Sequence, residues 1–225
     1  MATEIEKAKK LIAGADALLI GASNGLSIAE GYNIFADNEM FRRDFGEFRN
    51  RFGIRSVLDG LFFRYPTPAE RHAFLSKLVK DWVTDYRPSE VMKNLLAIVG
   101  GKDYFIVTTN GDTHLEESGF DPDKVFELEG TFVQVLEGKP IADKSDELNL
   151  FISKYCGKKL VVLELGIGSR NRMIKEPLMG LVAQNPTMSY ITLNLPHEIY
   201  IPSQIADRSV ALTGDIADTL KQLRQ

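Results

Sequence analysis

The sequence has little cysteine and no long apolar run, and both absences exclude whole classes of protein. Cys156 is the single cysteine among 225 residues, so the chain can form no internal disulfide and no cysteine cluster for zinc. No apolar run approaches the roughly 20 residues that cross a bilayer, and residues 1–7 lack the pattern of a signal peptide. We therefore expect a protein of the reducing cytoplasm, without a membrane partner and without a bound metal.

The chain also lacks an excess of basic residues. Its 27 basic and 31 acidic residues give a net charge of −4, which argues against a broad electrostatic grip on nucleic acid. Hydrophobic residues make up 44% of the chain and charged residues 26%, as in ordinary globular proteins, so a disordered or fibrous chain is excluded.

Short apolar segments alternate with helical patterns along most of the sequence. Such segments are typical of parallel strands that are buried on both faces; they lie at 17–20, 104–108, 124–128, 160–165, 190–193 and 209–212. Apolar residues at helical spacing predict helices over 4–13, 68–86 and 88–99. The alternation predicts an α/β protein with a Rossmann-like, mostly parallel six-stranded sheet.

Two long insertions do not fit a bare sheet of this kind. We expect a single domain over 1–225, with the sheet formed by 1–29, 104–130 and 159–225. Residues 30–103 and 131–158 are then expected to form a small helical subdomain or lid.

Glycine and small polar residues follow every predicted strand. In an open α/β sheet, ligands bind beyond the carboxyl ends of the strands, and small residues let the backbone approach a phosphate. These turns predict a nucleotide site; they lie at 21–27, 109–114, 129–131, 166–171, 194 and 214–215. Simpler readings remain open: a glycine can serve chain geometry alone, and Asp112 or Thr113 can cap the helix expected over 115–118.

Six of these segments resemble, in order, the motifs of the sirtuins, which are NAD-dependent protein deacylases and ADP-ribosyltransferases. The first turn is similar to G-A-G-x-S-x-x-x-G when Ser23 and Asn24 are read as an insertion, and Phe35 falls on the Phe of P-D-F-R. Residues 108–112 resemble T-Q-N-I-D, and 125–130 resemble the segment that ends in H-G. The remaining matches are 166–169 with G-T-S, Asn194 with the Asn after a strand, and 214–216 with G-D-A.

Three further segments resemble the macrodomain-linked bacterial sirtuins: 65–70, 102–105 and 164–168. This resemblance implies NAD as cofactor and a protein acceptor for ADP-ribose, with a lipoyl-carrier protein as the acceptor in that branch. Two alternatives stay open: a deacylase in which Glu129 replaces the usual His, and a catalytically silent sensor of NAD or ADP-ribose.

The resemblance also implies roles for single residues. Asn110 would lie beside the nicotinamide ribose, Asp112 would hold the nicotinamide carboxamide, and Glu129 would accept a proton or stabilise positive charge on the ribose. The implied cofactor-binding residues are Gly21, Ala22, Gly25, Ser27, Phe35, Thr109, Asn110, Asp112, Gly166, Gly168, Ser169, Asn194, Gly214, Asp215 and Ile216.

The chain departs from the family pattern at several positions. It lacks the cysteine pairs of the sirtuin zinc ribbon, and Ile34 and Ala36 stand where P-D-F-R has Asp and Arg. Thr109 replaces the Gln of T-Q-N, a shorter hydrogen-bonding group. Arg42 or Arg43 could replace the missing Arg, or form an exposed pair.

Two other side chains call for an expectation of their own. We expect His114 at the pocket mouth and Cys156 as a buried, inert thiol.

Overall fold

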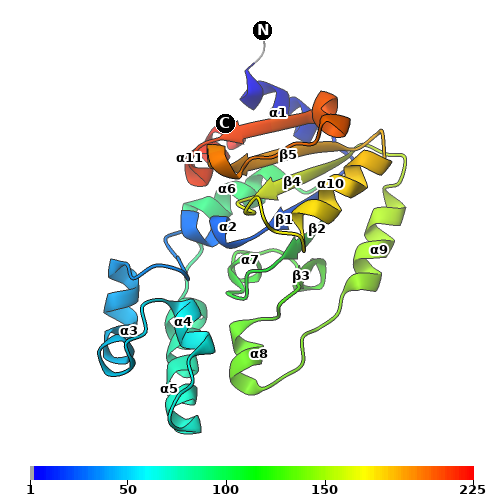
Figure 1. Cartoon of the computed structure of the whole chain (residues 1–225). Coiled ribbons are helices and arrows are strands. Elements are labelled where there is room, and N and C mark those ends of the chain that lie inside the picture. Colours follow the sequence, from blue (N-terminus) through cyan, green and yellow to red (C-terminus); the bar gives the residue numbers. More distant parts are fainter. Residues whose placement is uncertain (1–2) are drawn as a thin grey trace.

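A six-stranded sheet, parallel throughout, forms the centre of the computed structural model, which describes residues 3–225 (Figure 1). The strand order is β3-β2-β1-β4-β5-β6, so the chain crosses from β1 to either side of the sheet. The strands are β1 (Ala17–Ala22), β2 (Asp103–Thr108), β3 (Val125–Glu127), β4 (Leu160–Leu165), β5 (Ser189–Asn194) and β6 (Ser209–Thr213). The predicted fold class is confirmed.

Burial on both faces explains why the strands read as continuous apolar runs. Every residue of β1 and of β4 is buried, and the two strands pair in register from Ala17 opposite Leu160 to Ala22 opposite Leu165. A parallel sheet covered on both faces requires side chains of this kind.

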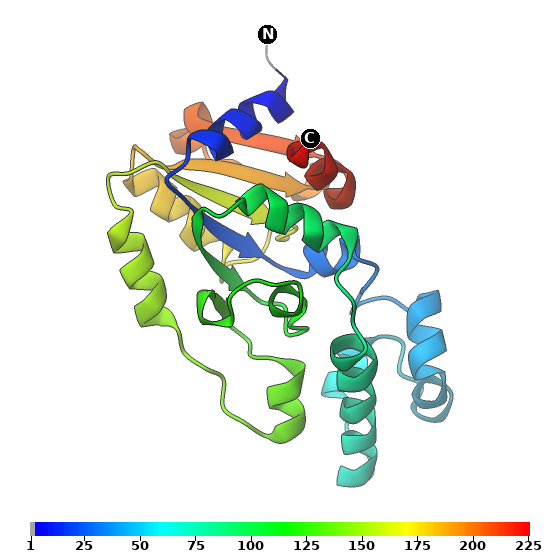
Figure 2. The same cartoon turned by 180° about the vertical axis from the view of Figure 1, so that it is seen from behind.

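Helices cover both faces of the sheet, and Figure 2 shows α6 across the side opposite to α10. One face packs against α1 (Glu4–Gly14), α2 (Asn24–Ala29), α6 (Glu90–Val99), α7 (His114–Glu117) and α11 (Ile216–Arg224). The other face packs against α9 (Ser145–Lys154) and α10 (Lys175–Gln184). Short 3₁₀ turns at Pro122–Lys124, Pro196–Glu198 and Ser203–Arg208 complete these layers.

A second group of helices lies beyond the sheet, at the bottom of Figure 1. This helical group comprises α3 (Glu39–Phe52), α4 (Val57–Phe62), α5 (Pro68–Val79), the π-helical segment η1 (Lys80–Thr84) and α8 (Phe132–Glu137). Its core is aromatic: the ring of Phe45 lies 5.2 Å from that of Phe74, and Trp82 is 1% exposed. Trp82 is therefore a core residue of this helical group.

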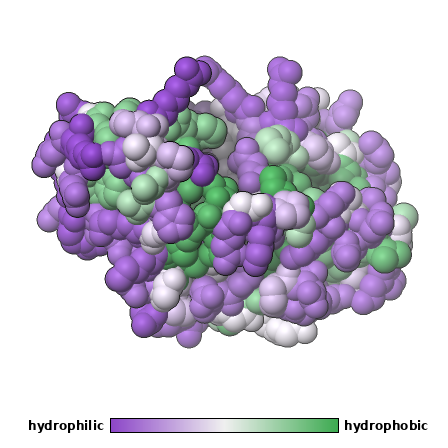
Figure 3. Space-filling view, turned by 90° about the horizontal axis from the view of Figure 1, so that it is seen from below, coloured by the Kyte–Doolittle hydropathy of each residue, from purple (hydrophilic) through white to green (hydrophobic). Residues whose placement is uncertain are grey.

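Local sequence explains where these helices begin. Asn38 accepts a hydrogen bond from the amide of Phe41 at the start of α3, and Thr67 and Glu70 form a capping box at the start of α5. Seen from below, this end of the molecule has apolar side chains gathered along the middle of its face (Figure 3).

Two details differ from the sequence-based expectation. The single helix predicted over 68–86 is divided, because the backbone passes from α5 into η1 at Lys80. Within the predicted insertions, α6 and α9 pack against the sheet, whereas α8 packs against the helical group through Phe132. We therefore propose a smaller helical subdomain, formed by α3, α4, α5, η1 and α8.

Two features are absent from residues 3–225. Among them, no helix combines the length and apolarity that crossing a membrane requires. The same residues contain no group of three or more His, Cys, Asp or Glu side chains able to hold a metal ion.

Candidate functional site

The main candidate site is a cavity of about 520 Å³ at the carboxyl ends of the strands. It lies where the strand order reverses between β1 and β4, the position at which open α/β sheets bind ligands. Its lining comes from the turns after β1, β4, β5 and β6: Ser23, Asn24, Gly25, Ile28, Ala29, Phe35, Gly166, Gly168, Asn171, Asn194, Leu195, His197, Glu198, Gly214, Asp215 and Ile216.

The structure brings about half of the predicted binding residues to this cavity. Those that line it are Gly25, Phe35, Gly166, Gly168, Asn194, Gly214, Asp215 and Ile216. The others lie outside its lining: Gly21, Ala22, Ser27, Thr109, Asn110, Asp112, Glu129 and Ser169. The sequence did not single out Ile28 or Glu198, which also line the cavity.

Two glycines make the floor of the cavity possible. The amide of Gly25 donates to the carbonyl of Gly166 at 3.1 Å, and a Cβ on Gly25 would lie 2.5 Å from the Cα of Gly166. Gly166 also has a φ of +61°, which side-chain-bearing residues rarely adopt. Glycine is therefore needed at both positions, in the first turn of α2 and directly after β4, because the two backbones are in contact there.

Gly21 and Ala22 have a different local role. A Cβ on Gly21 would lie 2.4 Å from Cδ1 of Leu178, so this glycine makes room for α10. Ala22 is fully buried in β1. Neither residue lines the cavity, so both serve the packing of the fold rather than contact with a ligand there.

A buried polar cluster lies next to the cavity, where β1 and β2 end. Asn110 donates from Nδ2 to the carbonyl of Ser23 at 3.1 Å and to Oγ of Ser27 at 3.0 Å. The Ser27 hydroxyl in turn donates to Oδ2 of Asp112 at 2.5 Å, and Oδ1 of Asp112 accepts from the amide of His114. Thr109 and Ser23 pair their hydroxyls at 2.9 Å. The structure thus brings Ser27, Thr109, Asn110 and Asp112 together.

One acceptor in this cluster has no partner. Oδ1 of Asn110 is buried and receives no hydrogen bond from the described part of the chain, although Asn110 is only 5% exposed. The orientation of the amide follows from chemistry, because the carbonyl of Ser23 can accept only from the NH₂ group. Leaving a buried acceptor unsatisfied costs about 1–3 kcal/mol, so the atom marks a place where a ligand that donates a hydrogen bond would be stabilised.

His114 does not line the pocket mouth, contrary to the expectation from its sequence position. It is fully buried and stacks on Tyr86, with 3.7 Å between the ring centres. Its Nε2 meets the carbonyl of Trp82 at 2.7 Å, and its Nδ1 meets Oε2 of Glu30 at 3.0 Å. Burial alone would lower the pKa of His114. Asp112, Glu30 and the Trp82 carbonyl raise it by more than burial lowers it, so the pKa lies above its ordinary value.

Glu129 is exposed, in the turn that follows β3. A less obvious pair of carboxyl groups lies nearby: burial, a hydrogen bond to Glu127 and the charge of Asp112 raise the pKa of Glu116 to about 8. Neither glutamate lies in a glycine-rich turn, so no sequence pattern pointed to this pair.

Two loops, 166–171 and 195–198, form the wall of the cavity that we call the far wall, and hydrogen bonds hold it in place. Glu198 accepts from the amide of Ser169 at 2.5 Å, and this contact lowers the pKa of the Glu198 carboxyl. Asn194 donates from Nδ2 to the carbonyl of Ile167 at 2.8 Å. Asp215 caps α11 by accepting from the amide of Asp218.

The structure also decides two other expectations, on the Arg42 and Arg43 pair and on Cys156. Arg42 and Arg43 form the exposed pair that was one of the two readings, bound to Asp37 and Asp44 respectively. Cys156 is exposed rather than buried, because it follows the last turn of α9 at the surface.

Comparison with solved structures identifies the fold class of the chain. No family model matches the chain. A structure from a study of sirtuin substrate affinity superposes with a TM-score of 0.59 at 15% identity, covering 99% of this chain and 98% of its own. A Sir2 homologue in complex with NAD gives 0.59 at 16% identity, covering 97% and 92%. The fold is that of the sirtuins, and the resemblance is confirmed at this level.

A curated relative is similar in sequence along most of the chain. It is a protein ADP-ribosyltransferase of Staphylococcus aureus, 22% identical, and the similarity covers 95% of this chain and 85% of that protein.

Proposed function

We propose that the protein is a sirtuin-like enzyme that uses NAD to transfer ADP-ribose to a side chain of another protein. The unsatisfied Oδ1 of Asn110, beside a cavity at the switch point of the sheet, is the observation that carries this proposal. The sirtuin fold and the similarity to an ADP-ribosyltransferase support it.

The residues present fit NAD in two respects. The cavity has the size of a small-molecule site and carries glycine backbone on the floor between β1 and β4, where a diphosphate can approach closely. The buried Asn110 oxygen supplies an acceptor for a ribose hydroxyl or a carboxamide NH₂ group. NAD, when bound, supplies a glycosidic bond that is already activated by its cationic leaving group.

The chain's own residues would then position the reacting groups. We assign Asn110 to the nicotinamide ribose, and Ser27 to holding Asn110 and Asp112 in place rather than to the diphosphate. Gly25, Gly166, Gly168, Asn194, Gly214, Asp215 and Ile216 would surround the rest of the cofactor. Glu129, exposed at the end of β3, would accept a proton from the acceptor side chain.

The acceptor is the finer part of the proposal. The segments that resemble the macrodomain-linked branch favour a lipoyl-carrier protein as the acceptor. We propose that the enzyme acts on it in the cytoplasm. A second candidate function is that of a silent sensor of NAD or ADP-ribose. The exposure of Glu129 favours it, because a solvated carboxylate is not yet positioned against a substrate.

Incubation with NAD, with and without a lipoyl-carrier protein, tests these functions together. Release of nicotinamide that depends on the carrier, with a gain of ADP-ribose on the carrier by mass spectrometry, is expected for the transferase. Loss of an acyl group from the carrier would indicate a deacylase. Release of nicotinamide without any acceptor would indicate an NAD hydrolase. Binding of ADP-ribose with no nicotinamide release would leave the sensor.

A further inference from the structure

A fully buried lysine lies behind the wall of the candidate cavity. Lys175, at the start of α10, has a side chain only 1% exposed, and its Nζ contacts Oε1 of Glu164 at 2.8 Å. The same Nζ donates to two carbonyls, that of Ile167 at 3.1 Å and that of Glu198 at 3.2 Å. We call this arrangement the Lys175 clamp: the Nζ atom of Lys175 with Glu164, the Ile167 carbonyl and the Glu198 carbonyl.

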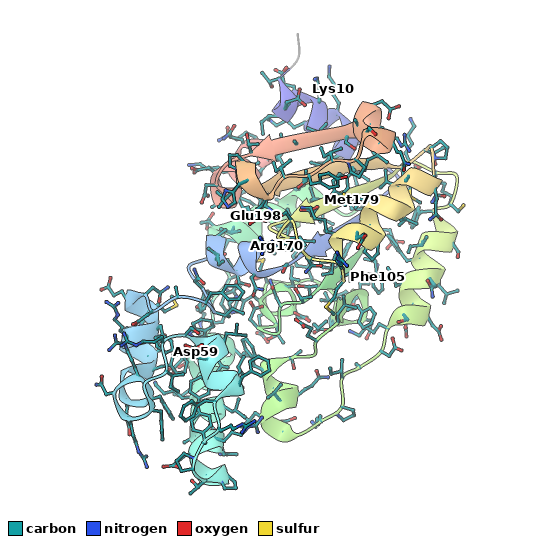
Figure 4. All side chains as sticks on the ribbon, in the orientation of Figure 1. Lys10, Asp59, Phe105, Arg170, Met179 and Glu198 are labelled. Carbon is teal, nitrogen blue, oxygen red and sulfur yellow. The ribbon has the colours of Figure 1, made fainter. Side chains whose placement is uncertain are left out.

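The two carbonyls belong to the two loops that form the far wall of the cavity. Ile167 lies between Gly166 and Gly168, which line the cavity, and Glu198 lines it directly. Figure 4 shows Glu198 and Arg170 on these loops, close to α10, which carries the labelled Met179. A single ammonium group thus ties both loops to the helix behind them.

The carboxylate of the clamp is held from the sheet. Tyr190 and Thr192, both fully buried in β5, donate their hydroxyls to Glu164. Burial raises the pKa of Glu164 above its ordinary value, and Lys175, Thr192 and Asn194 offset only part of this effect. A buried ion pair often contributes no net stability compared with apolar side chains. We therefore attribute to this ion pair a structural role: Glu164 holds the Lys175 ammonium group in a fixed position, from which it donates to the two loop carbonyls.

We propose that Lys175 is a positioning residue, which sets the distance between the 166–171 and 195–198 loops and so the shape of the cavity wall that faces the ADP half of NAD. The proposal rests on the proposed function only in naming the ligand. Loop order itself is a property of the free protein and can be measured without any ligand.

The test compares two lysine variants. Lys175→Met alone would leave Glu164 buried and unpaired, so the main variant is Lys175→Met combined with Glu164→Gln. The new amide accepts from one of the Tyr190 and Thr192 hydroxyls through its single oxygen and donates to the other through its NH₂ group. Lys102→Met is the matched control, because Lys102 also bridges two carbonyls, those of Ala13 and Ala15, at 3.2 and 3.0 Å. Those carbonyls lie in the last turn of α1 and at its C-cap, outside the lining of the cavity.

Three readouts, one of them without any ligand, distinguish a failure of the clamp from a failure of the proposed function. In the free proteins, amide hydrogen exchange over 166–171 and 195–198 should rise at least tenfold in the double variant and stay at the wild-type rate in the Lys102→Met control. By calorimetry, the Kd for ADP-ribose should rise about tenfold in the double variant only. If the enzyme turns over NAD, KM should rise while kcat stays within about twofold.

Each outcome has one meaning. Unchanged exchange in both loops of a folded double variant would overturn the clamp. If the wild-type protein binds neither ADP-ribose nor NAD, the proposed function fails, and the exchange readout still tests the clamp. If the double variant does not fold, Lys175→Gln replaces it, because a shorter neutral amide cannot reach all three partners; wild-type exchange in that variant would also overturn the proposal.

Discussion

At the scale of single residues, Asn110 is the sharpest test of the site. Asn110→Ala removes two donated hydrogen bonds and the unsatisfied oxygen. We expect nicotinamide release to fall by about 10²- to 10³-fold, the usual loss for one preorganised polar group, with only a modest rise in the Kd for NAD. Asn185→Ala is the control, since Asn185 also donates to a carbonyl, that of Leu181, but outside the cavity lining. Equal turnover in both variants would contradict the assigned role.

Glu129 is tested by its charge. If its carboxylate accepts a proton during transfer, Glu129→Gln should lower the rate about 10²- to 10⁴-fold and leave the Kd for NAD unchanged. Glu117→Gln serves as the control, because Glu117 is an exposed glutamate on the nearby α7. Full activity of Glu129→Ala in a steady-state assay would refute any catalytic role for this residue.

At the scale of elements, the contact between the β1 and β4 turns leads to a prediction about glycine. Gly166→Ala introduces a Cβ 2.5 Å from the Cα of Gly25, at a φ of +61°. Gly138→Ala at φ +65° meets no heavy atom of residues 3–225 within 4 Å, so it shares the backbone strain without the clash. Each strained position should cost about 1–2 kcal/mol of unfolding free energy.

We expect the clash to add to this cost for Gly166→Ala alone, and to abolish its binding of ADP-ribose. Urea unfolding and calorimetry of both variants would measure the two effects. An equal loss of stability, with ADP-ribose binding kept, would show that the turns do not require close contact.

The elements themselves were largely predictable. The six strands were found because burial on both faces leaves an apolar run that local sequence displays directly. The division of residues 68–86 was not predictable, because the apolar spacing of this segment does not distinguish an α-helical from a π-helical backbone, and Trp82 is buried within η1 in either case.

The candidate site was predictable only where its residues lie in glycine-rich strand ends, such as Gly25 and Gly166. Glu30, Glu164 and Lys175 carry no such signal: their roles depend on partners brought together from distant parts of the chain. His114 shows the limit most clearly: its position after a strand suggested the pocket mouth, but the rings of Tyr32 and Tyr86, from distant parts of the chain, pack against it and bury it.

At the scale of the whole molecule, ligand binding should raise the stability of the fold. A ligand that binds only the native state adds RT ln(1 + [L]/Kd), about 2.7 kcal/mol at 100 times Kd. For a chain of this length, that corresponds to a rise in melting temperature of several degrees. Thermal unfolding with ADP-ribose should show this rise in the wild type and in Asn110→Ala, but not in Gly166→Ala. No rise at millimolar NAD would contradict the nucleotide site.

His114 lies where the sheet meets the helical group, and its charge should make the free energy of unfolding depend on pH. His114 links Glu30, at the end of α2, to the carbonyl of Trp82 in η1, and Asp112 lies 3.8 Å from its Nδ1. The pKa of His114 is raised in the folded protein, so the charged form is favoured there more than in the unfolded chain. Its contribution to stability is then complete below the unfolded pKa of about 6.5 and is lost as the pH rises through the folded value.

The measurement is the free energy of unfolding in urea, from pH 5.5 to 8.5, for the wild type and His114→Gln. The advantage of the wild type should be largest at pH 5.5 and shrink as the pH rises. His197→Gln is the control, because His197 is 72% exposed and should give no such trend. An advantage that is constant or grows with pH would mean that His114 is neutral in the fold, and that the joint is held by its hydrogen bonds and by the stacked Tyr86 rather than by charge.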